Sequence, residues 1–184
     1  MTLDSWLPLL VLMTSLLTGL VIFFLREDQS RTRIVLNVAG ATLKLVLVGI
    51  MLWGVSQGHR YETRLPLLPE MDLVLRADAL ALLFVTLSAG LWLLTTVYAI
   101  GYLEDSPNRS RFFGFFSLCV TSTMGISLAG NLLTFFVFYE MLTLATYPMV
   151  IHRGTVASLQ AGRTYLIYTL GGCLLYTSPS PRDS

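Results

Sequence analysis

The sequence has few charged side chains: Asp, Glu, Lys and Arg make up only 12% of its 184 residues, against roughly 25% in soluble domains. Lysine occurs once, at position 44, and the formal net charge is +1. This chain therefore lacks the basic surface with which nucleic-acid-binding proteins neutralise phosphates, and we expect no nucleic-acid partner. Hydrophobic residues, by contrast, make up 54%. That composition is typical of a membrane protein.

Cysteine is also scarce, with Cys119 and Cys173 as the two occurrences. Two isolated thiols support neither a disulfide framework nor a metal site of paired thiolates. The sequence contains no glycine-rich phosphate loop, catalytic triad or paired-cysteine motif. We interpret His59 as a solvated loop residue rather than a metal ligand. We therefore expect no metal site, no cofactor and no catalytic residue.

Five apolar runs are long enough to cross about 30 Å of hydrocarbon at 1.5 Å per residue. They predict an all-α, polytopic transmembrane helix bundle with five complete spans. A sixth helix begins near Leu159 and is cut short by the C-terminal residues. The five runs occupy residues 6–25, 34–55, 78–101, 112–129 and 131–151.

The arginines of the connecting segments predict the orientation, because short cytoplasmic loops of membrane proteins are enriched in Lys and Arg. The first, third and fifth connections carry seven arginines, the second carries three, and the fourth carries none. This imbalance predicts an outside N-terminus in a cell (plasma) inner membrane. The second connection, SQGHRYETRLPLLPEMDLVLR, is the longest, and its prolines argue against a helix. The seven are Arg26, Arg31, Arg33, Arg109, Arg111, Arg153 and Arg163, and the three are Arg60, Arg64 and Arg76.

The last twelve residues, CLLYTSPSPRDS, interrupt the sixth apolar run. Residues 173–183 can be back-translated without a mismatch into the transposase adapter used to prepare sequencing libraries. We therefore interpret residues 173–184 as adapter translation without a domain, and residues 1–172 as the genuine part. Translated adapters are excluded from fold reasoning.

Two charged residues lie near the middle of predicted spans, where a charge costs roughly 2.5 to 3.5 kcal/mol on insertion scales and usually faces a bundle interior or an ion pathway. They are Lys44, in NVAGATLKLVLVGIML, and Glu140, in NLLTFFVFYEMLTLATYPMVI. We predict Glu140 as a proton-transfer residue, because a carboxyl near a basic group can load and release a proton as its surroundings change. Lys44 is predicted as an accessory intramembrane charge.

Each of these predictions has an alternative. Lys44 can snorkel toward an interface along its aliphatic stem. Glu140 can be a protonated carboxyl that hydrogen-bonds to a neighbouring helix.

Asp78 is interpreted as a helix cap. Small polar residues can line a wetted interior, although close helix packing is their commoner role. These residues are Asn37, Thr42, Thr121, Ser122, Thr123, Ser127, Thr143 and Thr146.

Residues 77–172 carry a family resemblance. The segments RADALALLFVTLSAGLWLLTTVYAIGYL, RFFGFFSLCVTSTMGISLAGNLLTFFVFYEMLTLATYP and AGRTYLIYTLGG resemble the antiporter-like membrane subunits of respiratory NADH:quinone oxidoreductase, membrane-bound hydrogenases and Mrp-type cation/proton antiporters. LATYPMVIHRGT followed by AGRTYLIYTLGG looks more like the branch of the Mrp D subunits. Glu140 matches the proton-handling glutamate of the family, whereas no family role is carried onto Lys44.

The resemblance implies a non-redox subunit of about fourteen helices, built from two inverted five-helix repeats, whose glutamate pairs with a lysine on the seventh helix. Implied partners are other membrane subunits, the lipid bilayer, protons and sodium. Residues 1–172 would then be the N-terminal part of this proton-translocating domain. The alternative is a non-transporting scaffold subunit that anchors partner proteins. A membrane enzyme acting on lipid or a redox centre lacks the necessary motifs.

The interpretation of the C-terminal residues predicts the outcome of re-sequencing the locus. The reading frame should continue past Gly172 with further apolar spans and an intramembrane lysine soon afterward. A genomic copy of TSPSPRDS followed directly by a stop codon would contradict it.

Overall fold

The computed structural model describes residues 3–25, 28–68, 71–102, 109–151 and 154–177. Arg26, Arg153 and the tail residues 178–184, which carry some of the expectations from the sequence, lie outside the described residues, as do the side chains of residues 173–177. In chain order the elements are α1 (Leu3–Phe24), α2 (Ser30–Ser56), β1 (Tyr61–Leu68), β2 (Met71–Ala77), α3 (Ala79–Tyr102), α4 (Arg109–Ser127), α5 (Leu132–Val150) and α6 (Val156–Thr177).

The five predicted apolar runs coincide with α1 to α5, and the expectation of a mostly helical bundle is confirmed. Four of these helices are long and apolar enough to cross a membrane: α1, α2, α3 and α5. The prediction of five complete spans is therefore not confirmed, because α4 is outside this group. Its sequence RSRFFGFFSLCVTSTMGIS contains two arginines and many hydroxyl residues, and nine of its residues are buried against other helices. The helix is apolar enough for a protein interior but less suited to lipid.

The sixth helix also differs from its prediction. It begins at Val156 and continues through Thr177, whereas the sequence predicted that it would end after Gly172. The backbone of α6 therefore stays helical across the proposed adapter junction after Gly172, because the segment Cys-Leu-Leu-Tyr is compatible with a helix.

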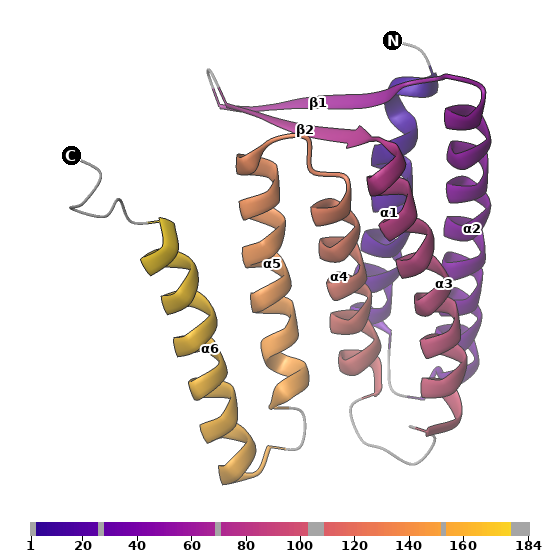
Figure 1. The fold of residues 1–184 in the computed structure, drawn as a ribbon. Coiled ribbons are helices and arrows are strands. Elements are labelled where there is room, and N and C mark those ends of the chain that lie inside the picture. Colours follow the sequence, from indigo (N-terminus) through magenta and orange to yellow (C-terminus); the bar gives the residue numbers. More distant parts are fainter. Residues whose placement is uncertain (1–2, 26–27, 69–70, 103–108, 152–153, 178–184) are drawn as a thin grey trace, which may run out of the picture.

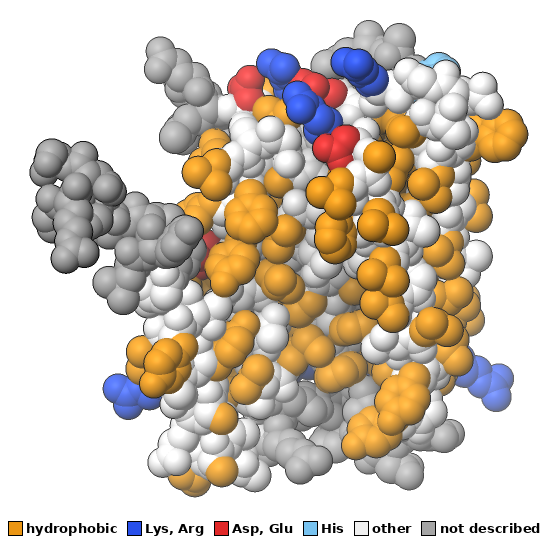
Figure 2. Space-filling model, viewed as in Figure 1, with side chains coloured by type: hydrophobic (Ala, Val, Ile, Leu, Met, Phe, Trp, Pro, Cys, Tyr) orange, Lys and Arg blue, Asp and Glu red, His pale blue; other side chains and the backbone are white. Residues whose placement is uncertain are grey.

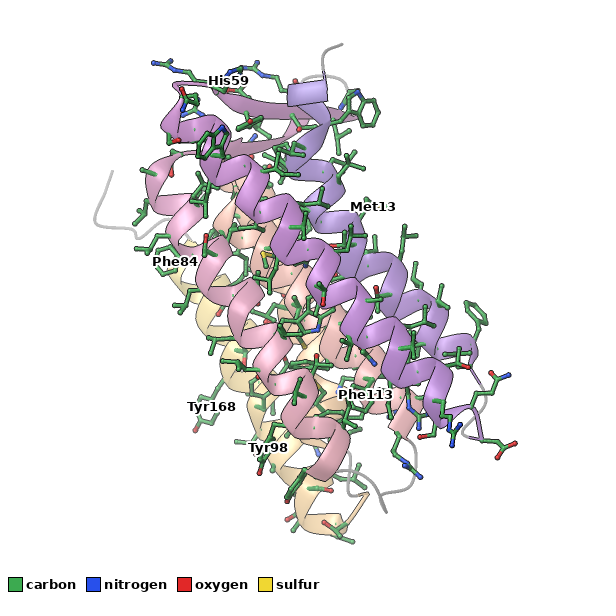
Figure 3. The ribbon with its side chains drawn as sticks, turned by 90° about the vertical axis from the view of Figure 1, so that its right-hand side faces the viewer. Met13, His59, Phe84, Tyr98, Phe113 and Tyr168 are labelled. Carbon is green, nitrogen blue, oxygen red and sulfur yellow. The ribbon has the colours of Figure 1, made fainter. Side chains whose placement is uncertain are left out.

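Helices α1 to α4 form a bundle, α5 packs on α4, and α6 packs on α5 at the edge (Figure 1). The bundle core contains Val11 of α1, Val48 and Met51 of α2, Val85 of α3 and Met124 of α4. Leucines, valines and aromatic residues cover the outside of the helices, and Figure 2 shows charged side chains gathered at the hairpin end with hydrophobic side chains below them. Tyr98 and Tyr168 point away from the bundle (Figure 3). This surface is typical of a protein that is solvated by lipid.

A β-hairpin covers the end of the bundle at which α1, α3 and α5 begin (Figure 1). Strand β1 pairs antiparallel with β2, from Tyr61 opposite Ala77 to Leu68 opposite Met71. The second strand also bonds to the α4–α5 connection, where Arg76 N donates to Leu128 O at 2.7 Å and Gly130 N to Val74 O at 2.7 Å. The connection is not helical, as its prolines predicted, but the hairpin was missed. The all-α prediction is wrong in this respect, because β1 and β2 pair with each other and β2 also bonds to the α4–α5 connection.

Opposite charges face one another on the hairpin. Arg64 donates from Nε to Glu62 Oε1 at 2.7 Å, and Arg76 Nε lies 3.6 Å from Glu62 Oε2. The hydrogen bond from Arg64 lowers the pKa of the Glu62 carboxyl from its ordinary value; partial desolvation opposes this shift and the charges of Arg64 and Arg76 add to it. The attraction is therefore present above the unfolded pKa of about 4.3 and is lost as pH falls through the folded value.

The contact between α4 and α5 depends on a glycine. A Cβ at Gly125 would overlap the ring of Phe138, whereas a Cβ at Gly90 of α3 would meet nothing within 4 Å. We expect Gly125→Ala to lower the free energy of unfolding by about 1 to 3 kcal/mol through overpacking, measured by denaturing-detergent titration. Gly90→Ala is the matched control and should not destabilise, since alanine is the better helix former. Equal stability of the two variants would contradict the packing.

Candidate functional site

Lys44 lies inside the α1–α4 bundle, fully buried on the inner face of α2. Its Nζ donates a hydrogen bond to Ser15 Oγ of α1 at 2.5 Å and lies 4.7 Å from the centre of the Trp92 ring of α3. Thr121 of α4 is hydrogen-bonded to the same Ser15 hydroxyl, with 2.9 Å between the oxygens. Four helices therefore meet around this ammonium group.

The sequence left open whether Lys44 snorkels toward an interface. In the structure its ammonium group ends on Ser15 and Trp92, both near the middle of their helices, and the side chain has no exposed surface. A cation over an aromatic face is stabilised electrostatically, more so when both are removed from water. In the described part of the chain, no carboxylate contacts this ammonium.

Glu140 lies near the middle of α5, between Leu132 and Val150, and is partly exposed. Helix α5 packs against α4 on one side and α6 on the other. Among the described residues Glu140 has neither a hydrogen bond nor an ion pair. Within the part of the chain that the structure describes, this carboxyl therefore has no polar partner.

The structure does not bring Glu140 and Lys44 together. Lys44 is enclosed by α1, α3 and α4, whereas Glu140 lies on α5, which joins the bundle through α4. No ion pair between them occurs in the described ranges. In the described residues, the two charges therefore do not neutralise each other.

Most of the small hydroxyl residues that the sequence singled out bond to their own helix. Thr143 donates to Tyr139 O and Thr146 to Leu142 O, and Thr42 does the same while facing outward. Such back-bonding accommodates a hydroxyl in an apolar helix. Asp78 accepts a hydrogen bond from Ala81 N at 2.7 Å, which confirms its role as a cap of α3.

The sequence analysis did not single out several buried polar residues on the helices that surround Lys44. They are Ser15 of α1, Trp92 and Thr96 of α3, and Ser117 of α4, all with at most 1% exposure. A signal was present in part: Ser117 and Thr121, like Trp92 and Thr96, are four residues apart, a spacing that places two side chains on one face of a helix. Which faces turn toward Lys44 is decided by the packing.

A cavity of about 580 Å³ lies at the hairpin end. Charged residues of both signs line it, and exposed His59 lies at this end of the molecule (Figure 3), with its ring stacked on Tyr61. No group of three or more His, Cys, Asp or Glu in the described residues is arranged to hold a metal ion. Among the lining residues are Arg60, Glu62, Arg76 and Asp78.

The family model described as NADH-Ubiquinone oxidoreductase (complex I), chain 5 N-terminus, matches residues 70–113. NADH-quinone oxidoreductase subunit L of Mycobacterium tuberculosis is 33% identical over 81 residues, which are 44% of this chain and 13% of that protein. The D subunit of the Na(+)/H(+) antiporter of Bacillus subtilis is 25% identical over 171 residues, or 92% of this chain and 34% of that protein. So extensive a match necessarily includes α2 and α5.

Two solved structures share the fold. The Mrp complex from Dietzia sp. matches with a TM-score of 0.69 at 25% identity, over 90% of this chain and 31% of that one. The membrane-bound sulfane sulfur reductase, an archaeal respiratory membrane complex, matches with a TM-score of 0.73 at 20% identity, over 89% of this chain and 26% of that one. This chain spans about a third or less of the length of all four relatives.

Sequence and fold thus point to one group of proteins. The matches extend over all six helices, and both the respiratory and the antiporter complexes recur among them. The chain is similar to the antiporter-like membrane subunits of NADH-quinone oxidoreductases and Mrp Na+/H+ antiporters.

Proposed function

We propose that residues 1–172 are the N-terminal part of a proton-translocating subunit, in a multisubunit NADH:quinone oxidoreductase or an Mrp-type cation/proton antiporter, with Glu140 as the proton carrier. The observation that carries this proposal is the isolated carboxyl in the middle of α5, partly exposed and without a partner in the described chain. A carboxyl at this depth is costly, and such residues usually serve an ion or proton pathway.

The position of α5 supports the same conclusion. This helix packs on α4 and α6 and contacts β2 at its start, and Glu140 keeps a partly exposed side chain, whereas Lys44 is fully buried. A carboxyl whose neighbours can change gains and loses its proton with them, because a nearby cation favours the charged form and apolar surroundings favour the neutral form. The relatives are longer than this chain, and we propose that a lysine on a following helix is the partner of Glu140.

The proposed setting is the inner (plasma) membrane, with other membrane subunits as partners, protons as the transported species and sodium as the coupled cation. The arginine imbalance supports an outside N-terminus. In this orientation the hairpin faces outward, and Arg31, Arg109, Arg111 and Arg163 lie at the opposite, cytoplasmic end.

The two ends of α2 provide a matched test of this orientation. Gln29 precedes the helix and Gln57 follows it, both exposed. In intact cells a membrane-impermeant maleimide should label Gln57→Cys and spare Gln29→Cys, in a background in which Cys119 and Cys173 are replaced by serine. Labelling of Gln29→Cys alone would reverse the orientation.

The role of Glu140 is tested in the complete complex that contains the full-length subunit. Glu140→Gln keeps the shape and hydrogen-bonding capacity but removes the titratable proton. We expect proton flux in reconstituted vesicles to fall roughly a hundredfold, the scale of a positioned acid–base group. Glu140→Asp should retain part of the flux.

Thr143→Val is the control on the same helix, because it removes only the bond from Thr143 to Tyr139 O. This variant should transport normally. Normal flux of an assembled Glu140→Gln complex would refute the proton-carrier role and favour the scaffold alternative.

A further inference from the structure

A second polar region lies inside the α1–α4 bundle, apart from Glu140. On α2, Arg33, Asn37 and Lys44 are buried on one face, with at most 2% exposure. Thr96 of α3 and Ser110 and Ser117 of α4 are buried opposite them, with at most 5% exposure. We call these six residues the polar seam.

Hydrogen bonds join the helices at both ends of the polar seam. At one end Arg33 Nη1 donates to Ser110 Oγ at 2.7 Å, and at the other Lys44 Nζ donates to Ser15 Oγ, which is bonded to Thr121. Helices α2 and α4 run in the same direction (Figure 1). Lys44 follows Arg33, and Thr121 follows Ser110, by eleven residues, or about 16 Å along a helix. The polar seam is therefore a path of three helical turns.

Polar atoms between these two ends lack partners. Four buried side-chain atoms of the described residues have no hydrogen bond: Asn37 Oδ1, Trp92 Nε1, Thr96 Oγ1 and Ser117 Oγ. Three belong to the polar seam, and the fourth belongs to the ring that Lys44 contacts. Buried polar atoms are nearly always paired, and buried water supplies the partner where protein does not. An ammonium group also carries three donors, and Ser15 accepts one.

The path is polar in one direction only. Beyond Lys44, toward the hairpin, the core is apolar, with Val48 and Met51 of α2 next to Val11 and Val85. In the other direction the polar seam leads to Arg33 and the end of the bundle where α2 begins. A small apolar cluster that includes Phe113 borders it there. Water therefore has buried polar partners between the Arg33 end and Lys44, whereas the described core side chains next to Lys44 on the hairpin side are apolar.

Charged groups near Lys44 are few on every packed element. Helix α3 contains no Asp, Glu, Lys or Arg. The charged residues of α4, Arg109 and Arg111, lie at its first turn, beside Ser110. On α1 the charged residue is Asp4, near the hairpin end, and on α2 the others are Arg31 and Arg33. Apart from Lys44 itself, the charged groups of these helices thus lie toward the helix ends.

We propose that water fills the polar seam and that Lys44 exchanges its proton through this water with the Arg33 end of the bundle alone. The ammonium group of Lys44 releases one proton to this chain of water molecules and becomes a neutral amine, and it regains a proton by the reverse step. Lys44 is then a second protonation site, closed toward the hairpin. This inference does not depend on proton transport by Glu140.

The composition of the chain allows a direct test, because Lys44 is the sole lysine. Isotope-labelled lysine in the full chain, in lipid nanodiscs, gives one side-chain nitrogen signal. We expect this signal to show magnetisation transfer from water and to move as bulk pH is changed, because Lys44 gains and loses its proton through this water. A signal without transfer from water and with a constant shift would refute the proposal.

A variant of similar volume tests the route. Asn37→Leu replaces the polar group that follows Arg33 with an apolar one, and exchange between water and Lys44 should slow at least about tenfold, since water needs polar partners. Thr42→Val is the control on the same helix, because Thr42 is exposed and bonds only to Val38 O. Thr96→Val is a second, milder block and should slow exchange in the same direction. Unchanged exchange in either blocking variant that is folded would overturn the route from the Arg33 end.

Discussion

The bundle depends on the burial of one ammonium group. Lys44 has no exposed surface, so its hydrogen-bond acceptor and its aromatic face must come from other helices, and Ser15 of α1 and Trp92 of α3 provide them. Small residues, glycines among them, allow these helices to come close enough for the contacts of Lys44. A Cβ at Gly19 would lie 3.0 Å from Ser117 Cβ, and one at Gly40 would lie 2.5 Å from Thr18 Oγ1. Polar burial thus joins all four helices, and glycine packing brings three of them, α1, α2 and α4, close together.

Helix α5 is attached differently. It meets α4 through the close approach of Phe138 to Gly125, and no charged contact of Glu140 reinforces it in the described residues. The enclosed charge, Lys44, therefore lies among α1 to α4, and the partly exposed charge, Glu140, lies on α5 outside this group. The two proposed protonation sites are thus separate in the structure.

The hairpin satisfies backbone groups that the helix ends leave free. The carbonyl of Leu128, just after α4, accepts from Arg76 N at 2.7 Å. Asn131 acts twice: its Oδ1 caps α5 through Thr134 N, and its Nδ2 donates to Asp72 O, both at 2.8 Å. The end of a helix in lipid has no water to bond its free groups. The hairpin therefore closes the bundle where α4 turns into α5.

The sequence alone was enough to determine the helical runs, the position of two charged residues in the middle of apolar helices and the cap at Asp78, because length, hydropathy and capping are local properties. It could not determine that the second connection pairs as a hairpin, since β1 and β2 contact α1 and the α4–α5 connection. The sequence also did not show that other helices cover the buried face of α4, where its hydroxyl side chains are accommodated. The surroundings of the two charges were decided by tertiary structure. Whether Lys44 meets Ser15, and whether Glu140 meets a partner among the described residues, depends on which helix faces pack together, and hydropathy does not encode that choice.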